Sequence, residues 1–231
     1  MASAFETVAD FLVEDRRTVD GLSVEDQRLA TVGCLLVVGP EGPELAATLR
    51  EAIREGSAPK RLEAMLVHAI GYLGVVVPRR AYEQLRRALA EAGQATALDG
   101  AIPIPADRAA RVEQGARLYD RFDPGRRAQQ AAGFVPLSPI YYPRAMELSG
   151  LVLADGTLVA RDRQIMTVAM LASLGGQSDQ LRFHIGVALG SGISRETLAA
   201  VLIIVQAYAG MPRANGAASL ALEMLADDSA S

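Results

Sequence analysis

The chain has 231 residues, of which 50% are hydrophobic and only 5% aromatic, so it is long enough to bury a full core. Its formal net charge of −4, without a basic stripe, excludes ordinary nucleic-acid binding proteins. The single cysteine, Cys34, excludes an intramolecular disulfide and agrees with a reducing compartment.

The first helical pattern runs over Phe5–Arg17, where Phe5, Val8, Phe11 and Leu12 share one face. Serine before an apolar pattern is typical of a helix cap, and proline is typical of the first turn. On these signals Ser23 caps a helix through Val38, and further helices are predicted at Pro43–Glu55, Pro59–Leu73 and Pro78–Ala92.

A linker is predicted over Gly93–Ala106, where two prolines interrupt any regular element. Helices are expected after it at Asp107–Phe122, Pro143–Leu153, Arg161–Leu174, Ser178–Leu189, Ser194–Ala209 and Arg213–Ala226. Turns are expected at Asp123-Pro124-Gly125 and Asp155-Gly156, and Gly133–Pro143, with three prolines, is expected to be a loop or short broken helix. Because strand signals are nearly absent, the sequence predicts an all-α fold.

The sequence repeats itself at an offset of 136 positions, which aligns Leu22 with Leu158 and needs no gap up to Gly74 and Gly210. Glycines recur at this offset, and they require the same helix ends rather than merely the same hydrophobicity. We therefore expect two tandem helical units that form a pseudo-dimer, with residues 1–92 as the first unit, 93–106 as the linker and 107–231 as the second unit.

The most informative stretch is residues 180–192, where Leu181, Ile185 and Ala188 recur at helical spacing. His184 lies in the same apolar face, so it should point into a pocket or the core. Glycines end this helix, Ser194 can cap the next, and that helix ends in a Tyr-x-Gly-x-Pro segment at 208–212.

This layout resembles the carboxymuconolactone decarboxylase family, small all-helical proteins related in fold to alkylhydroperoxidase D. The resemblance is strongest from Arg161 to about Leu225, and a weaker stretch, Arg111 to Gly115, resembles the family's N-terminal Arg-x-x-x-Gly helix. The residues at motif positions are Arg163, Leu181, His184, Gly192, Tyr208, Gly210, Pro212 and Asn215. The first copy has Thr48 where the second has His184, so we expect the first unit to be degenerate and to keep only the packing.

The resemblance implies catalytic roles for two residues. His184 would act as an acid or base, because an imidazole that titrates near neutrality can exchange a proton with carbon. Arg163 would anchor a carboxylate through its guanidinium fork. The alternatives are a buried, hydrogen-bonded histidine and a surface ion pair of Arg163 with Asp162 or Asp179.

Substrate-binding candidates are Tyr141, Tyr142, Glu147 and Tyr208. The tyrosine pair could also be an amphipathic surface feature. Glu147 is displaced by one residue from the family's Glu-x-x-Trp-Gly segment, and the tryptophan is missing. His68, on an apolar helix face, is interpreted chiefly as a core or interface residue.

The thiol branch of the superfamily carries Cys-x-x-Cys just before the helical histidine. This chain has Gln177 and Gln180 at those positions, so a thiol peroxidase is rejected. No His-Glu-x-x-His or nucleotide-binding glycine motif is present, and no metal or cofactor is expected.

The sequence thus predicts a cofactor-independent decarboxylase-like lyase acting on a small carboxylated lactone or related carbonyl acid. The alternatives are a polyketide tailoring enzyme (cyclase, dehydratase or lactone-opening enzyme) and a non-catalytic ligand-binding helical protein. A deep pocket around His184 would favour an enzyme, and a filled core there a structural role. We further expect a small acidic substrate, no nucleic-acid or membrane partner, a cytoplasmic location and a homo-oligomer, with a trimer of these double-length chains as the first expectation.

Overall fold

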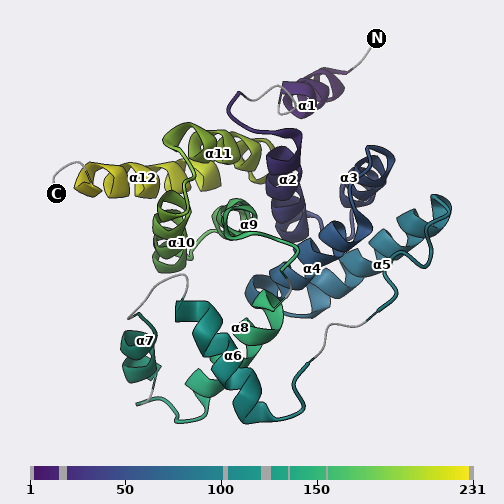
Figure 1. The fold of residues 1–231 in the computed structure, drawn as a ribbon. Helices are drawn as coiled ribbons and strands as arrows, with labels where there is room; N and C mark the ends of the chain where they lie inside the picture. The colour runs from purple at the N-terminus through teal and green to yellow at the C-terminus, as the bar shows by residue number, and fades with distance from the viewer. Residues whose placement is uncertain are drawn as a thin grey trace.

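The computed structural model describes residues 3–15, 20–100, 104–120, 126–134, 136–154 and 156–228, and within these ranges it contains helices and no strand (Figure 1). The all-α prediction is therefore confirmed for the described part of the chain. The helices are α1 (Ala4–Asp15), α2 (Val24–Val38), α3 (Pro43–Arg54), α4 (Pro59–Leu73), α5 (Val76–Glu91), α6 (Arg108–Asp120), α7 (Arg126–Phe134), α8 (Tyr141–Leu153), α9 (Ala160–Leu174), α10 (Ser178–Gly190), α11 (Arg195–Ala209) and α12 (Met211–Asp228). None of the described helices combines the length and apolarity that a membrane span requires.

The main departure from the predicted elements is α7, because the sequence predicts no helix immediately before the loop at 133–143. Its arginine, alanine and glutamine residues are strong helix formers, and it contacts α6 and α8. Helix α8 begins two residues before Pro143, since a proline in the first turn removes no intrahelical hydrogen bond. The turn predicted at 123–125 lies outside the described residues, as do Arg16, Arg17 and Asp155.

Local capping explains where the central helices begin. Ser23 accepts a hydrogen bond from the backbone of Asp26, and the Asp26 carboxylate accepts one from the backbone of Ser23, which forms a capping box ahead of α2. Ser194 caps α11 through the backbone of Thr197, as predicted. Helices α2 and α9 are buried along most of their length and form the centre of the core.

Four helices of the first half have counterparts in the second at the offset of 136 residues. The bounds of α2, α3, α4 and α5 recur as those of α9, α10, α11 and α12 to within one residue at their starts. Helix α9 is seen end-on in the middle of Figure 1, where α2 packs against it. At this crossing a Cβ atom on Gly33 would lie only 2.9 Å from the carbonyl oxygen of Met166 and 3.3 Å from Ala169, the residue at its own offset position.

Ion pairs join the two halves next to this crossing. Arg161 binds Asp26 through both guanidinium nitrogens, at 2.6 and 2.9 Å, and Arg61 reaches Asp162 at 2.9 Å. Burial raises the pKa of Asp26, but the hydrogen bonds and charge of Arg161 outweigh it, so that the pKa lies below its ordinary value. Both aspartates therefore link the first half to the second.

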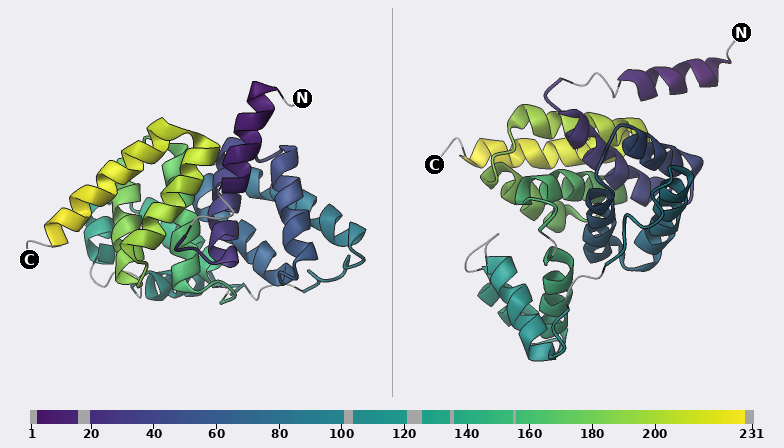
Figure 2. Two further views of the ribbon diagram at one scale, coloured as in Figure 1. Left: turned by 90° about the horizontal axis from the view of Figure 1, so that it is seen from above. Right: turned by 45° about the vertical axis from the view of Figure 1, so that its right-hand side comes forward.

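Helices α6 and α8 form a hairpin that extends from the rest of the molecule (Figure 2, right) and contacts it through α8 and α4. Its axes approach closely because glycines face each other. A Cβ atom on Gly150 would lie 2.8 Å from the backbone of Arg111 and of Gly115, and one on Gly115 would collide with the carbonyl oxygen of Met146.

Gly115→Ala is expected to lower the free energy of unfolding of the hairpin by about 1–3 kcal/mol, because the helices must separate to admit the methyl group. Hydrogen exchange at α6 and α8, with denaturant unfolding, measures the effect. Gly216→Ala in α12, where a Cβ would meet nothing within 4 Å, is the control and is expected to stabilise by roughly 0.5–1 kcal/mol. Wild-type protection of α6 in Gly115→Ala would contradict the close crossing.

Candidate active site

A pocket of about 220 Å³ lies where α4, α8, α9 and α10 meet. Polar side chains on its wall are His68 and Tyr72 from α4, Ser149 from α8, Arg163 and Gln164 from α9, and Gln180 and His184 from α10. Most of the remaining wall is apolar and includes Met146, Leu148, Val152, Leu153, Phe183 and Val187. The pocket thus combines one helix of the first half with three helices from the rest of the chain.

His184 is oriented by a neighbouring helix. Its Nδ1 atom lies 2.9 Å from the side-chain oxygen of Gln164. Because an amide oxygen can only accept, Nδ1 carries the proton, and Nε2 is the nitrogen that can exchange a proton in the neutral ring. The rings of Phe183 and Tyr72 meet the imidazole edge-on, with centroids 4.9 and 5.3 Å away. These contacts determine both the tautomer and the plane of the half-buried ring.

Arg163 is buried, with 4% of its surface exposed. Its Nε donates to the carbonyl oxygen of Leu158 at 3.1 Å, and its Nη1 donates to that of Val152 at 3.2 Å. Nη1 also lies 3.3 Å from Nδ1 of His68. These acceptors are neutral, so none of them cancels the charge of the guanidinium at the pocket wall. Arg163 is therefore not the surface residue of the alternative interpretation.

His68 connects the first half of the chain to this arginine. Because a guanidinium only donates, Nδ1 of His68 accepts, and Nε2 then donates to the hydroxyl of Thr167 at 2.8 Å. Burial of the ring, which is 1% exposed, lowers the pKa of His68 to about 3, and the charges of Arg163 and His184 act in the same direction. His68 is thus neutral at physiological pH and able to accept from Arg163.

The helices that carry Arg163 and His184 are also the part of the chain with known relatives. Residues 139–223 match the Carboxymuconolactone decarboxylase family. Over 78 residues the chain is 32% identical to a 4-carboxymuconolactone decarboxylase of Acinetobacter baylyi (strain ATCC 33305 / BD413 / ADP1). The aligned stretch is 34% of this chain and 58% of the length of that curated relative.

The carboxymuconolactone decarboxylase match covers only part of the pocket. It contains the lining residues of α8, α9 and α10 but ends well short of α4, which contributes His68, Gly71 and Tyr72. The pocket wall is therefore completed by a segment outside the matched region.

The structure places the four predicted substrate-binding residues away from the lining of this pocket. Tyr141 is 51% exposed and packs on the ring of Phe134, with centroids 5.0 Å apart. Tyr142 stands beside it in the first turn of α8. Tyr208, at the end of α11, packs against the hydrophobic core.

Glu147 belongs instead to an ion-pair network within the hairpin. Its carboxylate lies 2.7 Å from Arg111, 3.0 Å from Arg144 and 3.3 Å from Arg108. The hydrogen bond from Arg111 lowers the pKa of Glu147, despite burial of the carboxylate, and the group is therefore charged near neutrality. Arg111, the first residue of the Arg-x-x-x-Gly resemblance, thus holds α6 on α8.

Sequence reasoning missed the contribution of α4. Tyr72 stands at the position of Tyr208 in the repeat, and the structure places Tyr72, not Tyr208, beside His184. Packing of α4 on α9 brings the first-half residue to the second-half site. A repeat alignment that includes Tyr72 indicates that this position matters, but it does not show which copy's tyrosine reaches which pocket.

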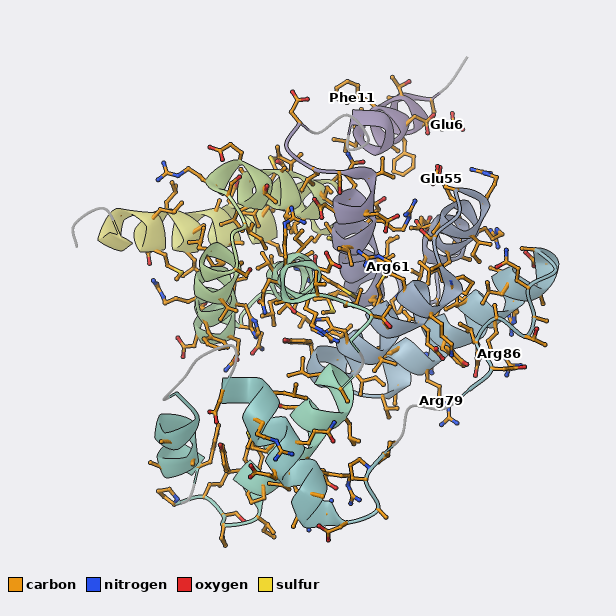
Figure 3. All side chains as sticks on the ribbon, viewed as in Figure 1. Glu6, Phe11, Glu55, Arg61, Arg79 and Arg86 are labelled. Atoms are coloured by element: carbon orange, nitrogen blue, oxygen red, sulfur yellow. The ribbon has the colours of Figure 1, made fainter. Side chains whose placement is uncertain are left out.

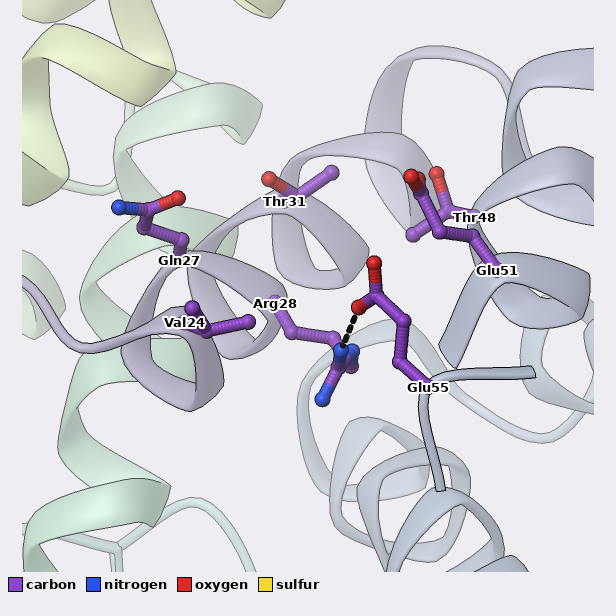
Figure 4. A pocket seen from close by; sticks show the side chains of 7 residues that line it. All are labelled: Val24, Gln27, Arg28, Thr31, Thr48, Glu51 and Glu55. Carbon is purple, nitrogen blue, oxygen red and sulfur yellow. Dashed lines mark hydrogen bonds and ion pairs between the residues drawn. The ribbon is translucent and has the colours of Figure 1, made fainter. Parts of the chain in front are cut away.

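The first half has its own pocket, of about 190 Å³, in the equivalent place (Figure 4). Its lining residues are Val24, Gln27, Arg28, Thr31, Thr48, Glu51 and Glu55. Gln27 replaces Arg163 and Thr48 replaces His184 at the offset of 136. Arg28 is bound to Glu55 at 2.7 Å and to Ser57 at 2.6 Å. This pocket therefore lacks a histidine among its lining residues, and its guanidinium is paired with a carboxylate.

Metal-binding side chains do not cluster in either pocket. Among the residues that the structure describes, no group of three or more histidine, cysteine, aspartate or glutamate side chains is arranged to hold a metal ion.

Proposed function

We propose that the chain is a cofactor-independent decarboxylase-like lyase that acts on a small carboxylated lactone or related carbonyl acid. The observation that carries the proposal is that Arg163 and His184 line the same pocket, each oriented by a second side chain. The family match over residues 139–223 and the similarity to a 4-carboxymuconolactone decarboxylase support the same reaction class.

The proposal includes the architecture. Two tandem carboxymuconolactone-decarboxylase-like units, at residues 1–92 and 107–231, would form a pseudo-dimer in which the first unit has lost its acid–base residue. The matching helix bounds and the Gly33–Ala169 contact at the crossing of α2 and α9 support this reading. The first unit would still contribute α4 to the working site.

In the proposed reaction the bond between the carboxylate carbon and the substrate carbon breaks and carbon dioxide leaves. The electron pair moves into the conjugated or lactone carbonyl, which forms an enolate. The protonated imidazole of His184 then gives its proton to carbon and regains one from solvent. One carboxylate is thereby replaced by one hydrogen, and the step needs no external oxidant or reductant.

The surroundings of the two residues suit this charge flow. Arg163 would hold a substrate carboxylate, since its described acceptors are two carbonyls and a neutral imidazole. The apolar wall formed by residues such as Val152 and Val187 disfavours a localised charge, so it would favour loss of the carboxylate as neutral carbon dioxide.

A non-catalytic helical protein would be expected to fill the space around His184. Instead the helices leave a pocket of about 220 Å³ there, and this favours an enzyme or at least a ligand-binding site. A tailoring enzyme that performs cyclisation or lactone opening could use the same acid–base residue, so the assay must follow the fate of the carboxylate.

The test is release of carbon dioxide by the pure protein from 4-carboxymuconolactone and from a panel of carboxylated lactones and β-keto acids. Product analysis by mass spectrometry distinguishes loss of carbon dioxide from ring opening or dehydration at constant carbon number. Binding without turnover, seen as a raised melting temperature across the panel, would support the non-catalytic alternative and overturn the lyase.

Arg163→Lys is expected to raise KM about tenfold to a hundredfold with a much smaller change in kcat, because lysine keeps the charge but loses the fork. Steady-state kinetics on the best substrate measures it. Arg182→Lys, which alters an exposed arginine paired with Glu223 on the same side of the fold, is the matched control. Equal KM values for both variants would show that Arg163 does not bind the substrate.

A further inference from the structure

Helix α1 presents an uncovered apolar face. Phe5, Val8, Phe11 and Leu12 lie on one side of it and are 82%, 59%, 65% and 39% exposed. The helix extends away from the rest of the fold in both views of Figure 2, and Figure 3 shows Phe11 on it, outside the body of the molecule. An isolated helix of 12 residues is marginal in water, so burial of this face would stabilise it.

A second uncovered apolar surface is a groove of about 270 Å³ between α11 and α12. Its walls are formed mainly by leucine, isoleucine and alanine side chains, and Ile203 and Leu222 are 43% and 65% exposed. The only charged residue of its lining is Arg195.

The first half shows what this surface looks like when it faces water. The positions equivalent to Asn215 and Leu222 are Arg79 and Arg86, which are exposed on α5 (Figure 3). An exposed leucine at a site where the other half carries arginine indicates that the groove of the second half is covered by an apolar partner.

Charge distinguishes between the possible partners. The residues of α1 include four acids and no base, whereas the groove carries one arginine, so the helix and the groove attract each other. The same acids disfavour insertion of α1 into a membrane surface, because anionic lipids repel a negative helix. In the structure the chain's own α1 points away from the groove and leaves it open.

We propose that α1 of one copy docks into the α11–α12 groove of a second copy, with its phenylalanines against Ile203 and Leu222. The helix and the groove are different patches of one chain, so a reciprocal exchange closes a dimer and a head-to-tail exchange closes a ring. The inference does not depend on the reaction at the pocket.

The decisive experiment mixes two single variants of the full chain, Phe11→Cys and Leu222→Cys, under mild oxidation. A disulfide between them can form only between copies, because each chain carries one engineered cysteine and Cys34 is buried. A heterodimer band on a non-reducing gel is expected. Replacing Leu222→Cys by Arg86→Cys, at the equivalent position of the first half, is the matched control and is expected to give no such band.

Light scattering provides the second measurement. The wild-type chain is expected to run as a multiple of its mass, and Phe11→Ser is expected to lower that mass, whereas Asp10→Ser, on the opposite face of α1, is expected to leave it unchanged. No heterodimer band, or an equal band with Arg86→Cys, overturns the proposal. So does a disulfide that forms only within the double Phe11→Cys, Leu222→Cys chain, or a monomer that instead sediments with anionic vesicles.

Discussion

His184→Ala is expected to reduce turnover by about a hundredfold to ten-thousandfold while the protein stays folded, because that is the usual loss when a general acid or base is removed. The geometry supports this size of effect. Gln164 holds Nδ1 at 2.9 Å and leaves proton exchange to Nε2 on a ring that lines the pocket. Turnover of the best decarboxylation substrate and the thermal unfolding midpoint should be measured on the same preparation.

Thr48→Ala is the control for this variant, because Thr48 occupies the equivalent position in the pocket of the first half. It is expected to retain wild-type turnover. His184→Gln keeps a hydrogen-bonding side chain but cannot transfer a proton, so it should rescue little. If His184 were structural, its removal would cost roughly 1–3 kcal/mol through the unpaired amide of Gln164. A variant that melts early but turns over at the wild-type rate would sink the catalytic assignment.

The second large effect concerns pH and stability. The pKa of His68 falls from 6.5 to about 3 on folding, so between these values the unfolded chain binds more protons than the folded one. Stability from this group is complete above pH 6.5 and is lost as the pH falls towards 3. At 1.36 kcal/mol per pKa unit, the free energy of unfolding is expected to drop by about 2 kcal/mol between pH 7 and pH 5.

His68→Gln provides the comparison, because glutamine is neutral throughout and can still accept from Arg163. The variant may start from any stability; what is compared is the slope of the unfolding free energy, from urea titrations, between pH 7 and pH 5. A clearly flatter slope in His68→Gln is expected. The carboxylates with lowered pKa values, Asp26 and Glu147, lose their contribution only at more acidic pH, so they do not mimic the effect. Identical slopes would show that His68 is not buried as a neutral ring.

The helices were largely predictable because their ends depend on local chemistry. Ser23 and Ser194 cap the helices that follow them, and Gly56 and Gly192 both adopt a φ of +86°, which side chains rarely permit. The offset of 136 residues added long-range information from the sequence itself, since two segments with the same pattern of glycines and apolar residues fold alike. Helix α7 was missed because the prolines that follow it obscured its helix-forming residues.

The candidate site was predictable only in part. The helical resemblance indicated Arg163 and His184, and the structure places both on one pocket. It also indicated Tyr208 and Glu147, which lie elsewhere, because a motif match shows that a residue type recurs but not which surface it faces. Glu147 is held by three arginines of the hairpin, two of which are on α6.

What the sequence by itself determined is the series of helices, the duplication and the chemistry available at positions 163 and 184. What only the tertiary structure decided is that α4 crosses to the other half, which brings His68 to Arg163 over a separation of 95 residues and Tyr72 to His184. The reason is physical: caps and periodicity depend on neighbours within a few turns, whereas the partner of a buried polar group is determined by how whole helices pack.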